Sequence, residues 1–95
     1  MAIQSFADRA TRVFFETGKP GNVGWAKVGS IVRRKLDMIH YAAKLNDLKV
    51  PPGNRLEALS RDLEGKHSIR VNDQWRVVFR WTESEPTEVE IADYH

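Results

Sequence analysis

The chain has 95 residues, of which 41% are hydrophobic, and it contains no cysteine. A chain of this length fits one domain with a single small core, and the lack of cysteine excludes both a disulfide framework and a thiolate metal site. No segment approaches the ~18 apolar residues of a membrane span, and the N-terminal residues lack the basic and apolar regions of a signal peptide. We therefore expect a single domain over residues 1–95 that is cytoplasmic and has no membrane partner.

The charged residues are unevenly distributed along the chain. All 15 Lys and Arg residues lie in residues 1–82 together with eight acidic residues, which gives this part a balance of +7. Residues 83–95 contain five acidic residues and no Lys or Arg. A basic body favours a polyanion such as RNA, because Lys and Arg neutralise phosphates whatever the nucleotide sequence. The alternative is an ordinary solvated basic surface.

The first half of the chain is predicted to be mainly helical. Residues 3–6 are typical of a short first strand, and a short helix follows, capped by Asp8 and ended by the Gly-Lys-Pro-Gly-Asn segment at residues 18–22. Apolar residues then recur at helical spacing, which predicts one amphipathic helix from Trp25 to about Lys49. Its apolar stripe consists of Trp25, Val28, Val32, Leu36, Ile39 and Ala43.

Three basic residues, Arg33, Arg34 and Lys35, lie beside and opposite this stripe. We therefore expect their side chains to project into solvent as a cationic cluster. Such a cluster suits binding to a large RNA surface, whose phosphates it can neutralise.

The second half of the chain is predicted to form strands. Residues 54–57, Asn-Arg-Leu-Glu, have the spacing of a helix N-cap, so we expect a helical turn or a loop over residues 54–60. Residues 67–71 and 75–81 alternate between apolar and polar side chains, which predicts a hairpin. A turn at residues 83–87 leads to a last strand. We therefore predict an α+β domain in which two helices pack on one face of a small, mainly antiparallel sheet.

The other face of this sheet is predicted to carry arginines. Arg70, Arg76 and Arg80 lie opposite the aromatic side chains, and guanidinium groups on a flat surface suit phosphate oxygens. The alternative is cross-strand pairing with Glu88 and Glu90, which we favour for Arg80. Arg76 lies in mid-strand and is the stronger candidate for binding phosphate.

Cleavage of RNA without a metal needs a base, a cation and an acid. Glu57, Arg76 and His95 have the chemistry for these roles, and Tyr94 is an alternative proton donor or a surface on which a base can stack. Each also has a structural explanation, since Glu57 fits a helix cap and His95 fits the end of a chain. The histidines lack the spacing of metal ligands, so we expect neither a metal nor a cofactor.

Three segments of the chain resemble the HigB branch of the RelE-type toxins, and within it the GraT-like members. They are Pro51–Glu57 (PPGNRLE), Gly65–Arg76 (GKHSIRVNDQWR) and the terminal Asp93-Tyr94-His95. The resemblance extends to Ile3–Phe6 and Lys35–Ile39 and so covers essentially the whole chain. It implies a toxin of a bacterial toxin–antitoxin pair that cleaves messenger RNA in the ribosomal A site by attack of the 2′-hydroxyl.

The resemblance also implies functional residues. The family's strand arginine matches Arg76, and its terminal residues match Asp93, Tyr94 and His95. Where well-known HigB proteins have a catalytic His and Lys, this chain has Glu57 and Ser60, which leaves the general base open. We assign the catalytic role to Glu57, Arg76, Asp93, Tyr94 and His95. We assign RNA or ribosome binding to Arg33, Arg34, Lys35, Arg55 and Arg70.

The partners implied by the resemblance are the ribosome, messenger RNA and a helix-turn-helix antitoxin of the HigA type, through which the complex binds operator DNA. Two other functions fit the same fold. One is a non-enzymatic toxin that blocks a protein such as gyrase, and the other is an RNA-binding or ribosome-associated module. The terminal Asp-Tyr-His favours the enzyme, because binding to an RNA backbone requires only Lys or Arg.

Overall fold

The structure, a computed structural model, describes residues 2–93 and places both α-helices before the sheet in the chain. The α-helices of this part are α1 (Arg9–Thr17) and α2 (Gly29–Tyr41). The strands are β1 (Glu57–Ala58), β2 (Lys66–Arg70), β3 (Trp75–Thr82) and β4 (Glu85–Asp93). Short 3₁₀-helices lie between them: η1 (Ala26–Val28), η2 (Leu45–Lys49), η3 (Pro52–Asn54) and η4 (Arg61–Leu63).

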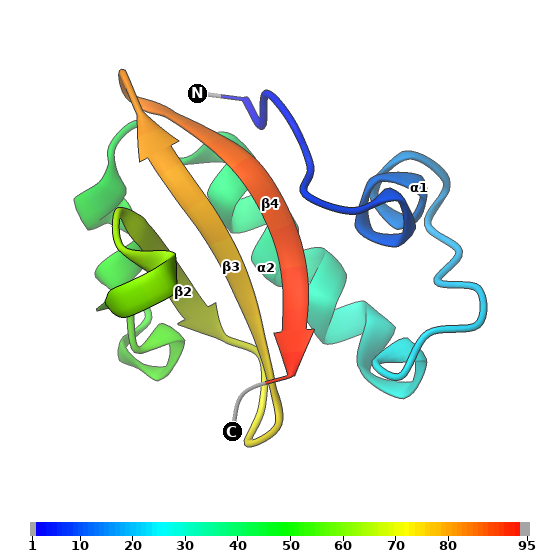
Figure 1. The fold of residues 1–95 in the computed structure, drawn as a ribbon. Coiled ribbons are helices and arrows are strands. Elements are labelled where there is room, and N and C mark those ends of the chain that lie inside the picture. Colours follow the sequence, from blue (N-terminus) through cyan, green and yellow to red (C-terminus); the bar gives the residue numbers. More distant parts are fainter. Residues whose placement is uncertain (1, 94–95) are drawn as a thin grey trace.

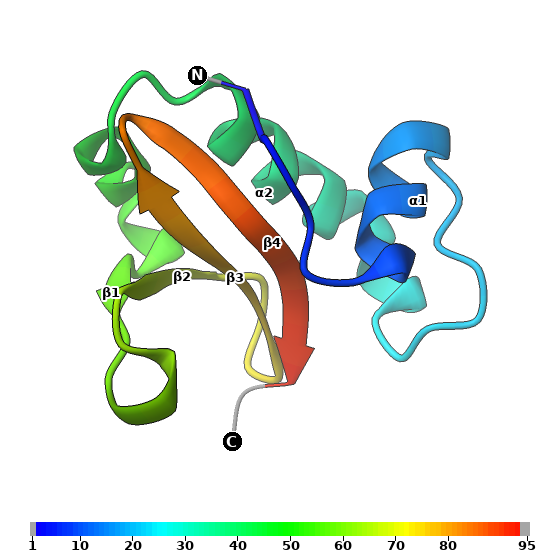
Figure 2. The ribbon, with the colours of Figure 1, turned by 45° about the horizontal axis from the view of Figure 1, so that its top comes forward.

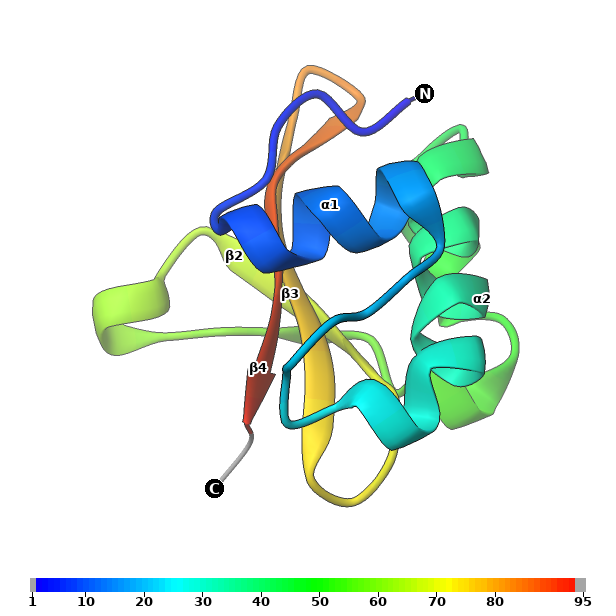
Figure 3. The same cartoon turned by 90° about the vertical axis from the view of Figure 1, so that its right-hand side faces the viewer.

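The strands form one antiparallel sheet in the order β1-β2-β3-β4, so each strand pairs with the next one in the chain. α2 runs across one face of the sheet, and η4 protrudes on the opposite side (Figure 1, Figure 3). The layer between α2 and the sheet is filled by fully buried side chains, among them Leu36, Ile39, Val77 and Phe79. The predicted α+β fold, with two helices and a mainly antiparallel sheet, is confirmed.

α1 has the predicted boundaries. The Asp8 carboxylate accepts a hydrogen bond from the Thr11 backbone amide at 2.7 Å, which satisfies one of the unpaired donors of the first turn. Gly18 ends the helix with a φ of 78°, a left-handed conformation that glycine adopts without steric cost. The helix lies beside β4 (Figure 1). Its Phe14 ring packs edge-on against the Trp25 ring, with 5.0 Å between the ring centroids.

The prediction of a first strand at residues 3–6 is wrong. This segment runs beside β4 (Figure 2), but it forms a single parallel bridge, between Phe6 and Val89, and no regular strand. Its backbone is still paired, because the Gln4 amide donates to the Pro86 carbonyl and the Val89 amide donates to the Ser5 carbonyl. The segment therefore covers part of the β4 edge.

The prediction of one helix from Trp25 to Lys49 is only partly correct. α2 ends at Tyr41, and Ala42 and Lys44 have extended backbones before the chain enters η2. The Asp47 carboxylate explains this break, because it accepts hydrogen bonds from the Ala43 and Lys44 amides and caps a new turn. As a result Ala42 is buried, and Ala43 is exposed where the stripe predicted it to be buried. No helix within residues 2–93 is long and apolar enough to cross a bilayer.

Of the two alternatives predicted for residues 54–60, a helical turn or a loop, the helical turn capped by Asn54 is wrong. Asn54 is fully buried, and its side-chain amide donates to the backbone carbonyls of Leu48 and Val50 at 3.2 and 3.4 Å. The chain then becomes extended, and Glu57 pairs with Ser68 on β2. Backbone pairing with β2 therefore replaces the local helical turn that the spacing of residues 54–57 predicted.

The β2–β3 connection is the predicted tight turn, in which the Asn72 side-chain oxygen accepts hydrogen bonds from the Gln74 and Trp75 amides. The β3–β4 turn is tighter than predicted. It consists of Glu83 and Ser84, whose φ angles of 49° and 72° both lie in the left-handed region. Such a two-residue turn matches the twist of paired strands.

Candidate active site

Arg76 is almost completely buried, with 5% of its surface exposed, and its guanidinium group is held from two directions. Nε donates a hydrogen bond to the Ser68 hydroxyl at 2.7 Å. Nη2 donates to the Arg55 backbone carbonyl at 2.8 Å and to the Ser68 carbonyl at 3.4 Å. These contacts fix the orientation of a charge that would be costly to bury without partners.

Local structure explains why these acceptors are present. Ser68 lies on β2, next to the strand that carries Arg76, and the register that pairs Arg70 with Arg76 puts the Ser68 side chain diagonally across from Arg76. Arg55 follows η3 with a φ of 47°, in the left-handed region that is costly for a residue with a side chain. Its carbonyl accepts the Arg76 hydrogen bond from this conformation.

Glu57 lies close to Arg76, as the proposed chemistry requires. One carboxylate oxygen of Glu57 is 3.6 Å from Nη2 of Arg76, and the Glu57 side chain is 47% exposed. The position follows from the β1–β2 register, in which Glu57 is paired with Ser68. The structure thus brings together two candidate residues that are 19 positions apart in the sequence.

A pocket of about 220 Å³ opens beside Arg76. Its polar lining consists of Ser68, Arg76 and Asp93, and its apolar lining of Leu59, Leu63, Val78 and Ala92. Leu63 of η4 is among the lining residues, and η4 protrudes from the sheet on the side away from α2 (Figure 3). Within residues 2–93 no group of three or more His, Asp or Glu side chains is arranged to hold a metal ion.

The last described residue of the chain lies at this pocket. Asp93, the last residue of β4, lines the pocket and accepts a hydrogen bond from the Gln74 side-chain amide at 3.1 Å. The predicted residues Tyr94 and His95 come next in the sequence and lie outside the described residues.

The prediction that Arg33, Arg34 and Lys35 project into solvent as a cluster is wrong for Lys35. This side chain is buried, and its amino group donates a hydrogen bond to the Asn54 side-chain oxygen at 2.6 Å. Burial lowers the pKa of Lys35, and the positive charges of Arg34 and Arg70 lower it further. The prediction failed because lysine has a long aliphatic stem. With this stem, a lysine at the margin of an apolar stripe can reach a buried acceptor.

The two arginines of the predicted cluster differ from each other. Arg34 is exposed. The Arg33 guanidinium lies 5.1 Å from the centre of the Phe15 ring, donates to the Phe15 carbonyl at 3.1 Å and pairs with Asp37 at 3.3 Å. Arg33 therefore holds α2 against α1, whereas Arg34 points to solvent.

The remaining arginines of the sheet face are paired with acids. Arg70 forms an ion pair with Asp73 in the β2–β3 turn. Arg80 pairs with Glu88 at 3.0 Å, which confirms the cross-strand pairing that we favoured for it. A β-bulge lies next to this ion pair. Val78 is opposite Glu90 and Arg80 is opposite Thr87, so between these two positions β4 has one residue more than β3.

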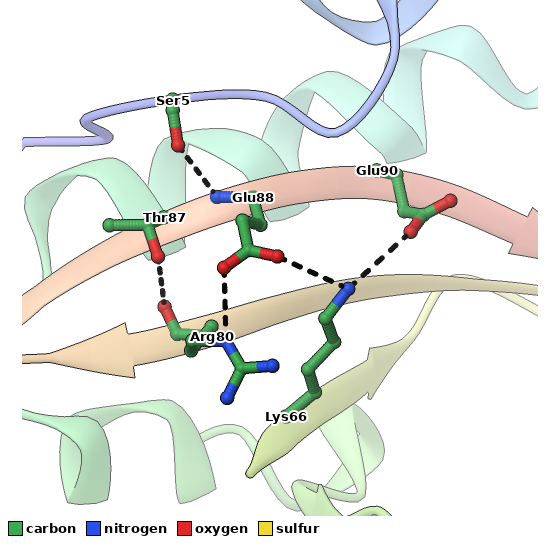
Figure 4. A network of polar contacts seen from close by, with 6 residues as sticks. All are labelled: Ser5, Lys66, Arg80, Thr87, Glu88 and Glu90. Carbon is green, nitrogen blue, oxygen red and sulfur yellow. Dashed lines mark hydrogen bonds and ion pairs between the residues drawn. The ribbon is translucent and has the colours of Figure 1, made fainter. Parts of the chain in front are cut away.

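Figure 4 shows that Lys66 joins the Arg80–Glu88 pair, because its amino group lies 3.6 Å from Glu88 and 4.0 Å from Glu90. Two acids of the segment 83–95 are thus neutralised by cations on β2 and β3. Arg76 lies farther along the sheet, beside the pocket. Glu88 and Glu90 of the last strand therefore do not line the pocket.

Ser68, the Arg55 carbonyl and the two leucines of the pocket were not predicted from the sequence. Ser68 has the same strand parity as Arg70, which indicates that it lies on the arginine face. The left-handed conformation of Arg55 has no comparable signal, because glycine or asparagine is the usual residue there.

The fold and the site define a small α+β protein with an anchored guanidinium beside a pocket on an antiparallel sheet. Residues 4–95 match the family described as the HigB-like toxin, a RelE-like toxin of the type II toxin–antitoxin system HigB. The chain therefore belongs to the HigB-like toxins. The family predicted from the sequence is confirmed, while the assignment to the GraT-like members stays a prediction.

Individual relatives agree with this assignment. The chain is 37% identical over 83 residues to the toxin HigB-1 of Vibrio cholerae, covering 87% of this chain and 86% of that protein. It is 33% identical over 82 residues to an uncharacterised protein of Haemophilus influenzae, covering 86% and 81% of the two chains. The solved YoeB–YefM complex from Staphylococcus aureus matches with a TM-score of 0.58 at 18% identity, covering 100% of this chain and 99% of that one. At this identity the last match shows a shared fold.

Proposed function

We propose that this toxin is an endoribonuclease that cleaves messenger RNA in the ribosomal A site without a metal ion. The observation that carries the proposal is the Arg76 guanidinium, buried, anchored by Ser68 and the Arg55 carbonyl, and 3.6 Å from the Glu57 carboxylate. A cation fixed before the substrate arrives needs no reorganisation when negative charge develops on a phosphate.

The reaction is an internal transfer at phosphorus. The Glu57 carboxylate removes the proton of the 2′-hydroxyl, and the resulting oxygen attacks the adjacent phosphorus. Arg76 stabilises the negative charge of the pentacoordinate phosphorane. The bond to the 5′-oxygen then breaks as His95, or alternatively Tyr94, donates a proton to it. The products are a 2′,3′-cyclic phosphate and a 5′-hydroxyl.

Glu57 suits the role of base for two reasons. Its side chain is about half exposed, so a substrate can reach the carboxylate, and its position on β1 is set by backbone pairing with β2. The ion pair with Arg76 orients the carboxylate toward the pocket side of the sheet. Asp93, at the pocket rim, takes a positioning role through its hydrogen bond with Gln74.

Ribosome binding is assigned to basic side chains outside the pocket. Arg34 and Arg55 are exposed, and Arg70 is one-third exposed beside Asp73. Arg33 and Lys35 are engaged within the fold, so we give them no direct contact with RNA. The proposed partner that neutralises the toxin is a helix-turn-helix antitoxin of the HigA type, through which the complex binds operator DNA. That a related fold was solved as a YoeB–YefM complex supports an antitoxin partner.

The test is a purified translation reaction in which the 5′ ends of the message are mapped with and without the toxin. We expect cuts within codons that carry 5′-hydroxyl ends, and almost none when naked RNA replaces translated message. Arg76→Ala should slow cutting by about 10²- to 10³-fold, the loss reported for one transition-state donor. Growth inhibition with an intact message would contradict the proposal, and a gyrase supercoiling assay would then test the protein-blocking alternative.

A further inference from the structure

Asn54 is a fully buried polar residue that the proposed reaction does not use. Its side-chain nitrogen donates to the backbone carbonyls of Leu48 and Val50, and its side-chain oxygen accepts a hydrogen bond from the Lys35 amino group. An amide with partners at both ends has one favoured orientation, because exchanging the two ends would set its oxygen against carbonyls and its nitrogen against an amino group. The Asn54 side chain is therefore fixed in the fold.

The backbone at Asn54 is fixed as well. The Asn54 amide donates to the Pro51 carbonyl at 2.9 Å, and the Arg55 amide donates to the Pro52 carbonyl at 3.1 Å. These two hydrogen bonds close the η3 turn, and Arg55 follows the turn in the left-handed region, with a φ of 47°. Because the Arg55 side chain is exposed, we attribute this costly conformation to the contacts of the turn and of Asn54.

The Arg55 carbonyl connects this turn to Arg76. It accepts the hydrogen bond from Nη2 of the guanidinium group at 2.8 Å. The direction of a carbonyl group follows from the backbone torsion angles of its own residue, since the peptide unit itself is planar. The conformation of Arg55 therefore decides where this acceptor points, and Asn54 is the buried residue next to it in the chain.

We propose that Asn54 is a positioning residue for the cleavage reaction, because its buried amide holds Arg55 in the conformation from which the Arg55 carbonyl orients Arg76. This inference rests on the proposed function, in which Arg76 stabilises the phosphorane. Asn54 is fully buried, so it acts through Arg55 and does not touch the RNA. A cation that stabilises a transition state works best when it is fixed before the charge develops, and this series of contacts provides such fixation.

α2 supplies two partners of the Asn54 amide. Lys35 donates to the amide oxygen at 2.6 Å, and the sulfur of Met38, about one turn farther along α2, accepts from the amide nitrogen at 3.6 Å. α2 runs across the face of the sheet away from η4 (Figure 3). The orientation of Arg76 therefore depends on side chains of this helix as well as on Ser68 in the sheet.

Asn54→Asp tests this role. Aspartate has nearly the same shape and keeps an oxygen that accepts from Lys35, but its second oxygen cannot donate to the Leu48 and Val50 carbonyls when the carboxylate is ionised. Rotation about the Cζ–Nη2 bond of Arg76, measured by nuclear magnetic resonance on the full chain, should become about tenfold faster, the factor expected for one hydrogen bond to a charged group. In cleavage of translated message, kcat should fall by about the same factor and KM should stay unchanged, because Asn54 contacts no substrate.

Val89→Ala is the matched control for a general loss of stability. Val89 is fully buried on β4, at the opposite edge of the sheet from β1, and its truncation leaves a cavity in the core. Urea unfolding measures the stability of each variant. The control should keep the rotation rate and the kcat of wild type. Equal changes in both variants would overturn the proposal, and so would wild-type rotation and kcat in folded Asn54→Asp.

Lys35→Met is a second variant that carries the test if Asn54→Asp does not fold. It leaves Asn54 in place and removes only the donor to its oxygen, so the rotation rate should rise and kcat should fall, each by less than in Asn54→Asp. Wild-type values of both in folded Lys35→Met would then contradict the positioning role.

The rotation measurement needs neither RNA nor ribosomes, so its outcome is independent of the proposed reaction. If wild-type protein cuts no message, the proposed function fails. The rotation rate still decides in that case whether Asn54 orients Arg76.

Discussion

At the scale of single residues, Arg76 is oriented by the Arg55 carbonyl and by Ser68. The fully buried Ser68 hydroxyl accepts the Nε hydrogen bond at 2.7 Å. Ser68→Ala should lower kcat for cleavage by roughly tenfold or more, since a hydrogen bond to a charged group contributes about 1.5–3 kcal/mol. KM should change little, because the substrate does not touch the hydroxyl in the proposed mechanism.

Ser68→Thr is the control for this prediction, since it keeps the hydroxyl and suits a strand. It should retain most of the activity that Ser68→Ala loses. A parallel fall of kcat in both variants would assign the effect to packing in the strand. Unchanged kcat in folded Ser68→Ala would show that the Arg55 carbonyl is sufficient to orient the guanidinium.

Lys35 leads to a prediction about stability and pH. Burial lowers its pKa in the folded protein, so between that value and the ordinary value of about 10.5 the unfolded chain binds more protons than the folded one. The contribution of Lys35 to the free energy of unfolding should therefore rise with pH across that window, and stay constant below it.

Urea unfolding of wild type and Lys35→Met from neutral pH to about pH 10.5 measures this contribution. The difference in unfolding free energy should move in favour of wild type as the pH rises. Curves that stay parallel across the range would contradict a depressed pKa. A buried lysine of this kind was not predictable from the sequence, because its acceptor, Asn54, is 19 residues away and had been assigned to a helix cap.

At the scale of elements, the hairpin between β3 and β4 departs from the usual turn chemistry. Glu83 and Ser84 both have positive φ, a conformation for which Asn-Gly is strongly preferred. Replacing them by Asn and Gly should raise the free energy of unfolding by about 1 kcal/mol. Neither residue lines the pocket, so cleavage activity should be unchanged.

Thermal or urea unfolding of the double variant measures this gain. Glu83→Ala is a useful comparison, because alanine keeps a side chain at a positive φ and should give no gain. A loss of stability in the Asn-Gly variant would mean that contacts of the native turn outweigh its backbone strain.

Elements with repeating patterns were predicted best. The period-two alternation of residues 67–71 and 75–81 and the Asn72 turn predicted the central hairpin, because each depends on neighbours in sequence. The break of α2 was missed although its cause, the Asp47 side chain, is local. The pairing of Glu57 and the β4 bulge were missed for a different reason. They depend on distant partners such as the β2 edge and the Lys66–Arg80–Glu88 network, which one sequence does not show.

The candidate site was predictable to a similar extent. Arg76 could be selected because an arginine in mid-strand on a polar face indicates binding chemistry, and the structure places Glu57 beside it. Strand parity indicates that Ser68 lies on the arginine face, but the sequence does not show that Ser68 and the Arg55 carbonyl accept hydrogen bonds from Arg76. Those contacts depend on register, which turn geometry and pairing set together.

At the scale of the whole molecule, positive charge connects α2 to the pocket. The positive charges of Arg34 on α2 and Arg70 on β2 both lower the pKa of Lys35. Lys35 in turn donates to Asn54, the residue before Arg55. The proposed ribosome contact therefore extends from α2, across the end of β2, to the rim of the site.

The double variant Arg34→Ala and Arg70→Ala tests this surface, and Arg9→Ala with Arg12→Ala is its matched control. The control removes the same charge from exposed positions on α1. This helix lies beside β4, toward the opposite edge of the sheet from β2 (Figure 1). Cosedimentation with ribosomes over a range of salt concentrations should show weaker binding for the first pair. Its dependence on salt should also be shallower, because each phosphate contact contributes roughly 0.7–0.9 to the slope of log affinity against log salt. The α1 pair should bind like wild type. An equal loss for both pairs would mean that net charge, and not this surface, attracts the toxin to the ribosome.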